Sequence, residues 1–206
     1  GIITFKGFFK KLDNNDLILN DVLKIETFVQ LIEAFFYIYI IFAINKLKNN
    51  SITNRRYIDW SITTPIMLIS TILFMEYSTN KIENFTTNTN DILEKNKKDI
   101  IEIILYNGGM LLFGYLGETN MIDKSLSILI GFVFFILSFY KIWDLFAYKI
   151  KKNRLLYYFL ICIWGLYGVA ALLPVISKNI MYNILDIISK NFYGLYIYYE
   201  ILKIKR

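Results

Sequence analysis

The residues with the clearest chemical potential lie near the end of the chain, where an aspartate precedes a lysine by four positions. Asp186 and Lys190 lie inside a long apolar run, from about 180 to 202. On a helix both side chains share one face. A lysine at membrane depth costs ~2.5–3.5 kcal/mol or more, so it indicates function by default. Such an amine can form a Schiff base with an aldehyde, with the carboxylate as counter-ion. A structural ion pair inside a helix bundle is the alternative interpretation of this segment.

A second group of polar residues follows Arg55. Arg56, Asp59 and Thr63 are three and four positions apart, so a helix places them on one face. A carboxylate beside a protonated Schiff base stabilises its charged form. We expect Arg56, one turn away, to keep Asp59 ionised, and the Thr63 hydroxyl to hydrogen-bond the carboxylate.

Two glutamates lie in an apolar run closer to the amino terminus. Glu26 and Glu33 are seven positions apart and therefore share a helix face. Glu26 is near the end of its run and can extend to water. Glu33 is near the middle, where an ionisable side chain faces the bundle interior or a water pathway. We expect Glu33 to line the interior and treat it as a candidate for ion or proton transfer.

The composition is that of a membrane protein. Of the 206 residues, 56% are hydrophobic and 17% aromatic, whereas a soluble domain is ~45–50% apolar. The mean hydropathy is +0.44. A spanning helix needs ~20 apolar residues, and the chain has six such runs, at about 22–46, 56–77, 99–117, 122–146, 155–177 and 179–203. The prediction is an all-α, polytopic membrane bundle with a single domain over residues 1–206.

Several kinds of site are excluded by what the sequence lacks. It has no histidine and one cysteine, Cys162, which excludes an intrachain disulfide and imidazole proton relays, and we expect no metal site. The net charge of +6 fits basic loops that face the cytoplasm. Nucleic-acid binding is therefore not expected.

The loops and ends suggest how the chain lies in the lipid bilayer. Residues 1–9 are too few to cross it as a helix, so we interpret them as the end of a truncated first helix, with a short interfacial segment as the alternative. The polar stretch 77–98 is expected to be a mobile loop. The loop 148–154 has four basic residues and no acid. The positive-inside rule then places this loop and the carboxyl terminus in the cytoplasm, and the amino terminus outside.

The segment from Arg56 to Pro65 resembles the third helix of the microbial (type 1) rhodopsins, whose pattern is R-Y-x-D-W-x-x-T-T-P. The Asp186–Lys190 pair is similar to their seventh helix. The resemblance covers about residues 15–205. It implies a seven-helix transmembrane domain that binds all-trans retinal as a Schiff base on Lys190, with Asp59 as proton acceptor and Asp186 as second counter-ion.

The resemblance also implies the lining of a retinal pocket. Residues 164–168 resemble the family's W-x-x-Y-P, with Gly168 in place of proline, and Ala171 replaces a further aromatic residue. We therefore expect a looser pocket near the retinal ring. Asn107 falls where the family places a polar partner for Thr64. The cofactor-binding residues that we expect are Lys190, Tyr57, Trp60, Thr64, Met67, Met110, Gly114, Trp164 and Tyr167.

Two positions depart from well-known members of the family. Ser70 stands where many outward proton pumps have a carboxylic acid that returns the proton, so water, Glu26 or Glu33 would have to relay it. Thr27 is expected to face Ser70. Lys178 replaces an acid that serves proton release in some archaeal members, so release is expected to differ from theirs.

Three functions remain open, none of them enzymatic. The one that we favour is a light-driven outward proton pump, supported by the Asp59–Thr63 acceptor with Arg56. The second is a light-gated cation channel, with Ser70, Glu26 and Glu33 on a hydrated path. The third is a photosensor. The chain most resembles the viral and proteorhodopsin-like branches, for which a homo-oligomer, a trimer or pentamer, is expected.

Overall fold

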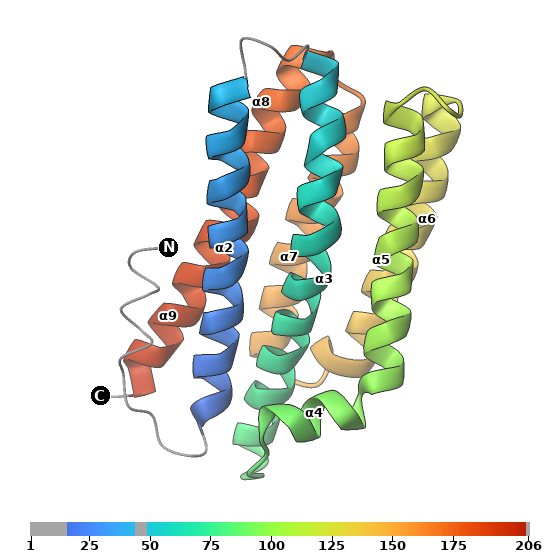
Figure 1. Ribbon diagram of the computed structural model, residues 1–206. Coiled ribbons are helices and arrows are strands. Elements are labelled where there is room, and N and C mark those ends of the chain that lie inside the picture. Colours follow the sequence, from blue (N-terminus) through green and yellow to red (C-terminus); the bar gives the residue numbers. More distant parts are fainter. Residues whose placement is uncertain (1–15, 44–48, 205–206) are drawn as a thin grey trace.

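Long helices joined by short connections make up the part of the chain that the computed structural model describes, residues 16–43 and 49–204 (Figure 1). In chain order they are α2 (Leu17–Ala43), α3 (Asn49–Ile82), α4 (Thr89–Lys95), α5 (Lys97–Glu118), α6 (Lys124–Ile142), η3 (Trp143–Ala147), α7 (Lys151–Ala171), α8 (Val175–Asp186), η4 (Ile187–Phe192) and α9 (Tyr193–Ile204). The η segments are π-helical turns that continue the helices beside them. Every element in these ranges is a helix, which confirms the predicted all-α class.

Six helical paths correspond to the six predicted spans. By length and apolar composition, α2, α3, α5, α6 with η3, and α7 can each cross a membrane. The sixth path runs from α8 through η4 to α9, and the π-helical turn divides it into shorter pieces. The predicted polytopic helical membrane bundle is therefore confirmed. The truncated first helix was expected over residues 1–9, which lie outside the described residues.

The stretch between the second and third of these paths contains more helix than predicted. Helix α3 continues to Ile82, and α4 occupies part of the expected loop. The Asn88 side chain accepts a hydrogen bond from the Asp91 backbone N–H at 2.9 Å. The Asp91 carboxylate accepts one from the Asn88 backbone N–H, and the two bonds form a capping box. Ile92 is buried in the core. The prediction of a loop over 77–98 is thus wrong for 77–82, for α4 and for 97–98, which begin α5. Polar residues form helix here because the capping box and the burial of Ile92 stabilise it.

One end of the bundle carries α4, the connection from η3 to α7 and the last turns of α9, and we call it the basic end (Figure 1). Its lysines contact buried acids. Lys149 lies 3.0 Å from Glu76, and Lys152 of α7 pairs with Glu200 of α9. The other end, where α3 and α8 begin, is called the opposite end below.

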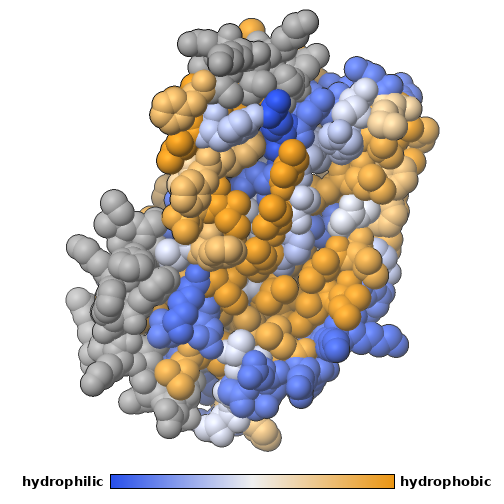
Figure 2. All heavy atoms as spheres, viewed as in Figure 1, coloured by the Kyte–Doolittle hydropathy of each residue, from blue (hydrophilic) through white to orange (hydrophobic). Residues whose placement is uncertain are grey.

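Polarity is distributed as expected for a protein surrounded by lipid. Large apolar side chains lie on the outside of the long helices, and Phe42 is 82% exposed. Figure 2 shows such side chains across one face of the molecule. Charged residues such as Glu26, Arg56 and Lys190 are buried instead. Because a charge facing hydrocarbon is costly, charges at this depth face the bundle interior.

Candidate functional site

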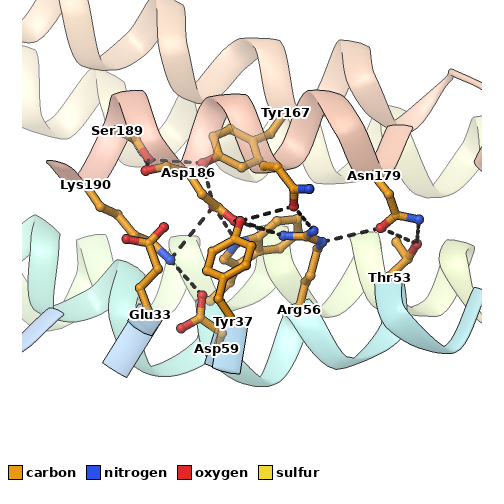
Figure 3. A network of polar contacts seen from close by, with 12 residues as sticks. Glu33, Tyr37, Thr53, Arg56, Asp59, Tyr167, Asn179, Asp186, Ser189 and Lys190 are labelled. Carbon is orange, nitrogen blue, oxygen red and sulfur yellow. Dashed lines mark hydrogen bonds and ion pairs between the residues drawn. The ribbon is translucent and has the colours of Figure 1, made fainter. Parts of the chain in front are cut away.

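The centre of the site is an ion pair between Lys190 and Asp59 in the bundle interior (Figure 3). Lys190 Nζ lies 2.7 Å from Asp59 Oδ2, and both side chains are 2% exposed. Lys190 belongs to η4 and Asp59 to α3. The second carboxylate, Asp186 Oδ1, is 3.8 Å from the same nitrogen. The amine therefore has a near and a more distant acidic partner.

Asp186 is held by donors from three helices. Arg56 Nη1 of α3 donates to Asp186 Oδ2 at 3.0 Å, and Trp60 Nε1 donates to Oδ1 at 3.2 Å. The hydroxyls of Tyr37 and Tyr167 donate at 2.9 and 2.8 Å. The sequence had paired Arg56 with Asp59, its neighbour on the helix. The structure instead places the guanidinium against Asp186, because the side chain extends along α3 toward the opposite end (Figure 3).

Amide side chains continue this network toward the opposite end. Arg56 Nη2 donates to Asn183 Oδ1, and Nε donates to Asn179 Oδ1 at 3.4 Å. Asn179 and Asn183 were not predicted, although their spacing places them on the helix face of Asp186. Near the same end, Lys178 pairs with Glu118, and both side chains are almost fully buried.

Of two neighbouring threonines in α3, Thr63 bonds differently from the prediction, whereas Thr64 has the expected partner, Asn107. Thr63 Oγ1 donates to the backbone carbonyl of Asp59 at 2.9 Å rather than to its carboxylate. A helical threonine reaches the carbonyl four residues back easily. Asp59 Oδ1 consequently has no hydrogen-bond partner among the described residues. Thr64 donates to Trp60 O, and it accepts from Asn107 Nδ2 at 2.8 Å.

An apolar cavity reaches Lys190. All nine residues expected to bind the cofactor line it, although they come from four helical segments. These are Lys190, Tyr57, Trp60, Thr64, Met67, Met110, Gly114, Trp164 and Tyr167.

Close contacts shape the cavity at two glycines. A Cβ atom on Gly114 would lie 2.8 Å from Tyr57 Oη, and one on Gly168 would lie 2.4 Å from the Phe132 ring. Phe132 and Tyr182 also line the cavity and were not predicted. The expected loosening at Gly168 is thus offset in part by an aromatic ring from α6, which no pattern in α7 could indicate.

A second buried polar group lies between Lys190 and the basic end. Glu26 is fully buried and interacts with Ser70 and Tyr193. Nevertheless, both Glu26 carboxyl oxygens and the two hydroxyls lack a hydrogen-bond partner of ordinary geometry within the described ranges. Two expectations are corrected here. Glu26 does not extend to water, and the residue that faces Ser70 is Glu26 rather than Thr27, whose hydroxyl donates to Leu23 O at 2.8 Å.

Glu33 lies beside Lys190 on the α2 side (Figure 3). It is 4% exposed, and its Oε2 accepts a hydrogen bond from Asn191 Nδ2 at 3.3 Å. Its Oε1 has no partner in the described part of the chain. The amine of Lys190 therefore has three carboxyl groups around it, two of which have an oxygen that is not hydrogen-bonded.

Comparisons with known proteins find relatives of this chain. The sequence model of the bacteriorhodopsin-like proteins matches residues 3–204. A green-light absorbing proteorhodopsin from Gamma-proteobacterium EBAC31A08 is 24% identical over 161 residues, which cover 69% of this chain and 59% of the relative. The chain thus spans about three-fifths of the length of the curated relatives that it matches.

Two solved structures share the fold. The crystal structure of viral rhodopsin OLPVRII superposes with a TM-score of 0.86 at 32% identity, covering 98% of this chain and 90% of that one. The blue light-absorbing proteorhodopsin from Med12 gives a TM-score of 0.73 at 19% identity, covering 99% and 89%. The second likeness concerns the fold alone.

Proposed function

Because the chain belongs to the bacteriorhodopsin-like protein family, which implies a retinal chromophore, we propose that it is a light-driven outward proton pump with retinal attached to Lys190. One observation carries the proposal. Lys190 Nζ lies 2.7 Å from Asp59 Oδ2, and Asp59 Oδ1 has no hydrogen-bond partner among the described residues. A donor and an acceptor are thus in direct contact, and the acceptor has room for a proton.

The residues of the cavity fit this cofactor. Small-molecule sites are concave and mostly apolar with a few polar groups, and the cavity at Lys190 has this character. Its lining is largely aromatic and aliphatic, and its amine, that of Lys190, is suited to an aldehyde. Trp60, Trp164 and Tyr167 would confine an extended apolar chain from several sides.

Asp59 and Asp186 have different roles beside Lys190. Bound retinal supplies light absorption and an isomerisation that changes the proton affinity of the Lys190 nitrogen. Asp59 then accepts the proton from that nitrogen. Asp186 already accepts four hydrogen bonds, one of them from Arg56, so it acts as a fixed counter-charge. Two carboxylates in different surroundings thereby take different roles.

The proton is returned from the side of the basic end. Ser70 has no ionisable group there, and Glu26, buried beside it, can hold and deliver a proton. The basic loop 148–154 supports a cytoplasmic location for this end, because basic loops favour that side of the membrane. Uptake at the basic end and release at the opposite end make the transport outward.

The test is the external pH of an illuminated suspension of cells that contain the protein and retinal. We expect acidification that a protonophore abolishes. A suspension whose pH does not change in the light, with the pigment present, would contradict the pump.

One observation favours a light-gated cation channel as a second candidate. Glu26, Gln30, Glu33 and Tyr37 form a polar column along one face of α2, and the first three are buried. Such a column could hydrate and conduct. Voltage-clamp currents distinguish the two functions, because a channel current reverses with the ion gradient, whereas a pump current keeps its direction.

A further inference from the structure

The peptide group of Lys190 is held by a side chain from α2. Gln30 Nε2 donates a hydrogen bond to the Lys190 carbonyl oxygen at 3.3 Å, and Gln30 is 5% exposed. Within its own helix this carbonyl accepts from the Tyr193 N–H, three residues ahead. The regular i→i+4 ladder is interrupted in the π-helical turn η4, so the Gln30 amide supplies a bond from outside the helix.

A second contact from α2 lies beside the first. Asn191 Nδ2 donates to Glu33 Oε2 at 3.3 Å. Two consecutive residues of η4 are therefore tied to two residues of α2 that are one helical turn apart. On the other side of η4, Tyr167 of α7 lies 3.0 Å from Ser189 Oγ. The turn that carries Lys190 is thus fixed from two helices.

The direction of the Lys190 side chain decides which carboxyl group it meets. Its nitrogen lies 2.7 Å from Asp59 and 3.8 Å from Asp186, and Glu33 also faces it (Figure 3). Displacement of a reacting atom by ~1 Å can cost ~100-fold in rate. A small shift of the Lys190 backbone would therefore change the distribution of protons among the acids.

We propose that Gln30 is a positioning residue, whose amide holds the Lys190 peptide so that Nζ meets Asp59 rather than Glu33. This inference rests on the proposed function, because it concerns proton transfer from the Lys190 nitrogen. The contact that carries this proposal is made to the Lys190 peptide oxygen. Gln30 acts through the backbone of the residue that carries the reacting nitrogen.

Light-minus-dark infrared spectroscopy tests the proposal, since a newly protonated carboxyl group gives a C=O band whose frequency falls on 13C labelling. In the wild type we expect this band to respond to [4-13C]aspartate only. In Gln30→Met, which keeps the side-chain length but loses the donor, we expect part of the band to respond to [5-13C]glutamate. Proton transfer to Asp59 should slow by ~10–100-fold.

A second variant and a control complete the experiment. Gln30→Asn keeps an amide that is one methylene too short, and it should behave like Gln30→Met. Thr27→Val removes a hydroxyl from α2 that bonds only to its own helix, and it should behave like the wild type. An aspartate-only band with wild-type rate in both Gln30 variants would overturn the role of Gln30 alone. A wild type without any light-induced carboxyl band would overturn the proposed function, and this role with it.

Discussion

The two halves of the bundle, divided at Lys190, bury their polar groups in different ways. Toward the opposite end, Asp186 accepts four hydrogen bonds and Arg56 donates to Asp186 and two asparagines. Toward the basic end, Glu26, Ser70 and Tyr193 meet in the interior with oxygens that lack partners within the described ranges.

This difference indicates two roles: fixed charges around Asp186, and a path for protons around Glu26. A buried polar network with its bonds made is rigid and preorganised. A buried polar group without a partner costs ~1–3 kcal/mol, so its presence calls for an explanation such as a bound water or a functional proton. The half toward the opposite end holds the counter-charge, Asp186, in place. Hydration and proton exchange are expected in the half toward the basic end.

The largest effect is expected from removing the residue that divides the halves. Lys190→Ala should abolish the visible absorption band completely, because the amine that holds retinal is lost. The measurement is the absorption spectrum of purified protein incubated with all-trans retinal. Lys141→Ala, which changes a lysine paired with Asp99 and Glu102 outside the cavity, is the control and should keep the band. A visible band in Lys190→Ala would rule out attachment there.

Asp59→Asn should retain the pigment but abolish proton transfer. Loss of the negative charge near the Lys190 nitrogen should move the absorption maximum to longer wavelength, since one counter-charge is gone. Flash photolysis measures both effects. A deprotonated species that forms at the wild-type rate in this variant would assign the acceptor role to another acid.

Arg56→Gln removes the guanidinium from the hydrogen-bonded network around Asp186. It removes the nearer of the two cations beside the buried Asp186 carboxylate, and breaking a buried ion pair typically costs ~3–5 kcal/mol of stability. Thermal denaturation of the pigment in detergent measures this loss. Arg55→Gln, which removes a neighbouring, partly exposed charge, should change stability by less than ~1 kcal/mol. Equal midpoints for the two variants would mean that the network adds little rigidity.

Glu26→Gln replaces the buried acid toward the basic end, and it should leave the stability of the protein almost unchanged. The amide cannot deliver a proton, so reprotonation should slow by ~100-fold or more, while the visible maximum stays close to the wild-type value. Time-resolved absorption at several pH values checks this, with Thr27→Val as the matched neighbour. Unchanged reprotonation would leave water as the relay.

The sequence predicted which residues share a helix face more reliably than which residues meet across helices. Spacing alone placed Arg56 with Asp59, but the side chain contacts Asp186 of another helix. Likewise Glu26, rather than Thr27, faces Ser70. The rotation of α2 relative to α3 depends on the packing of the whole bundle. The spacing of residues within one helix does not predict it. Resemblance predicted the cavity lining better, because it carries information about all the helices together.

The π-helical turn η4 also sets the phase of the helix that follows. A π turn amounts to one inserted residue, and each residue of an α-helix turns by ~100°. The side chains of Tyr193, Ile197 and Ile201, which point into the core, do so in the phase that this extra residue creates. Deleting one residue within η4 would restore the regular i→i+4 backbone hydrogen bonds of an α-helix. It would also rotate α9 by about a quarter turn and move this apolar stripe away from the core. The π-helical turn around Lys190 therefore also sets the rotation at which α9 packs against its neighbours.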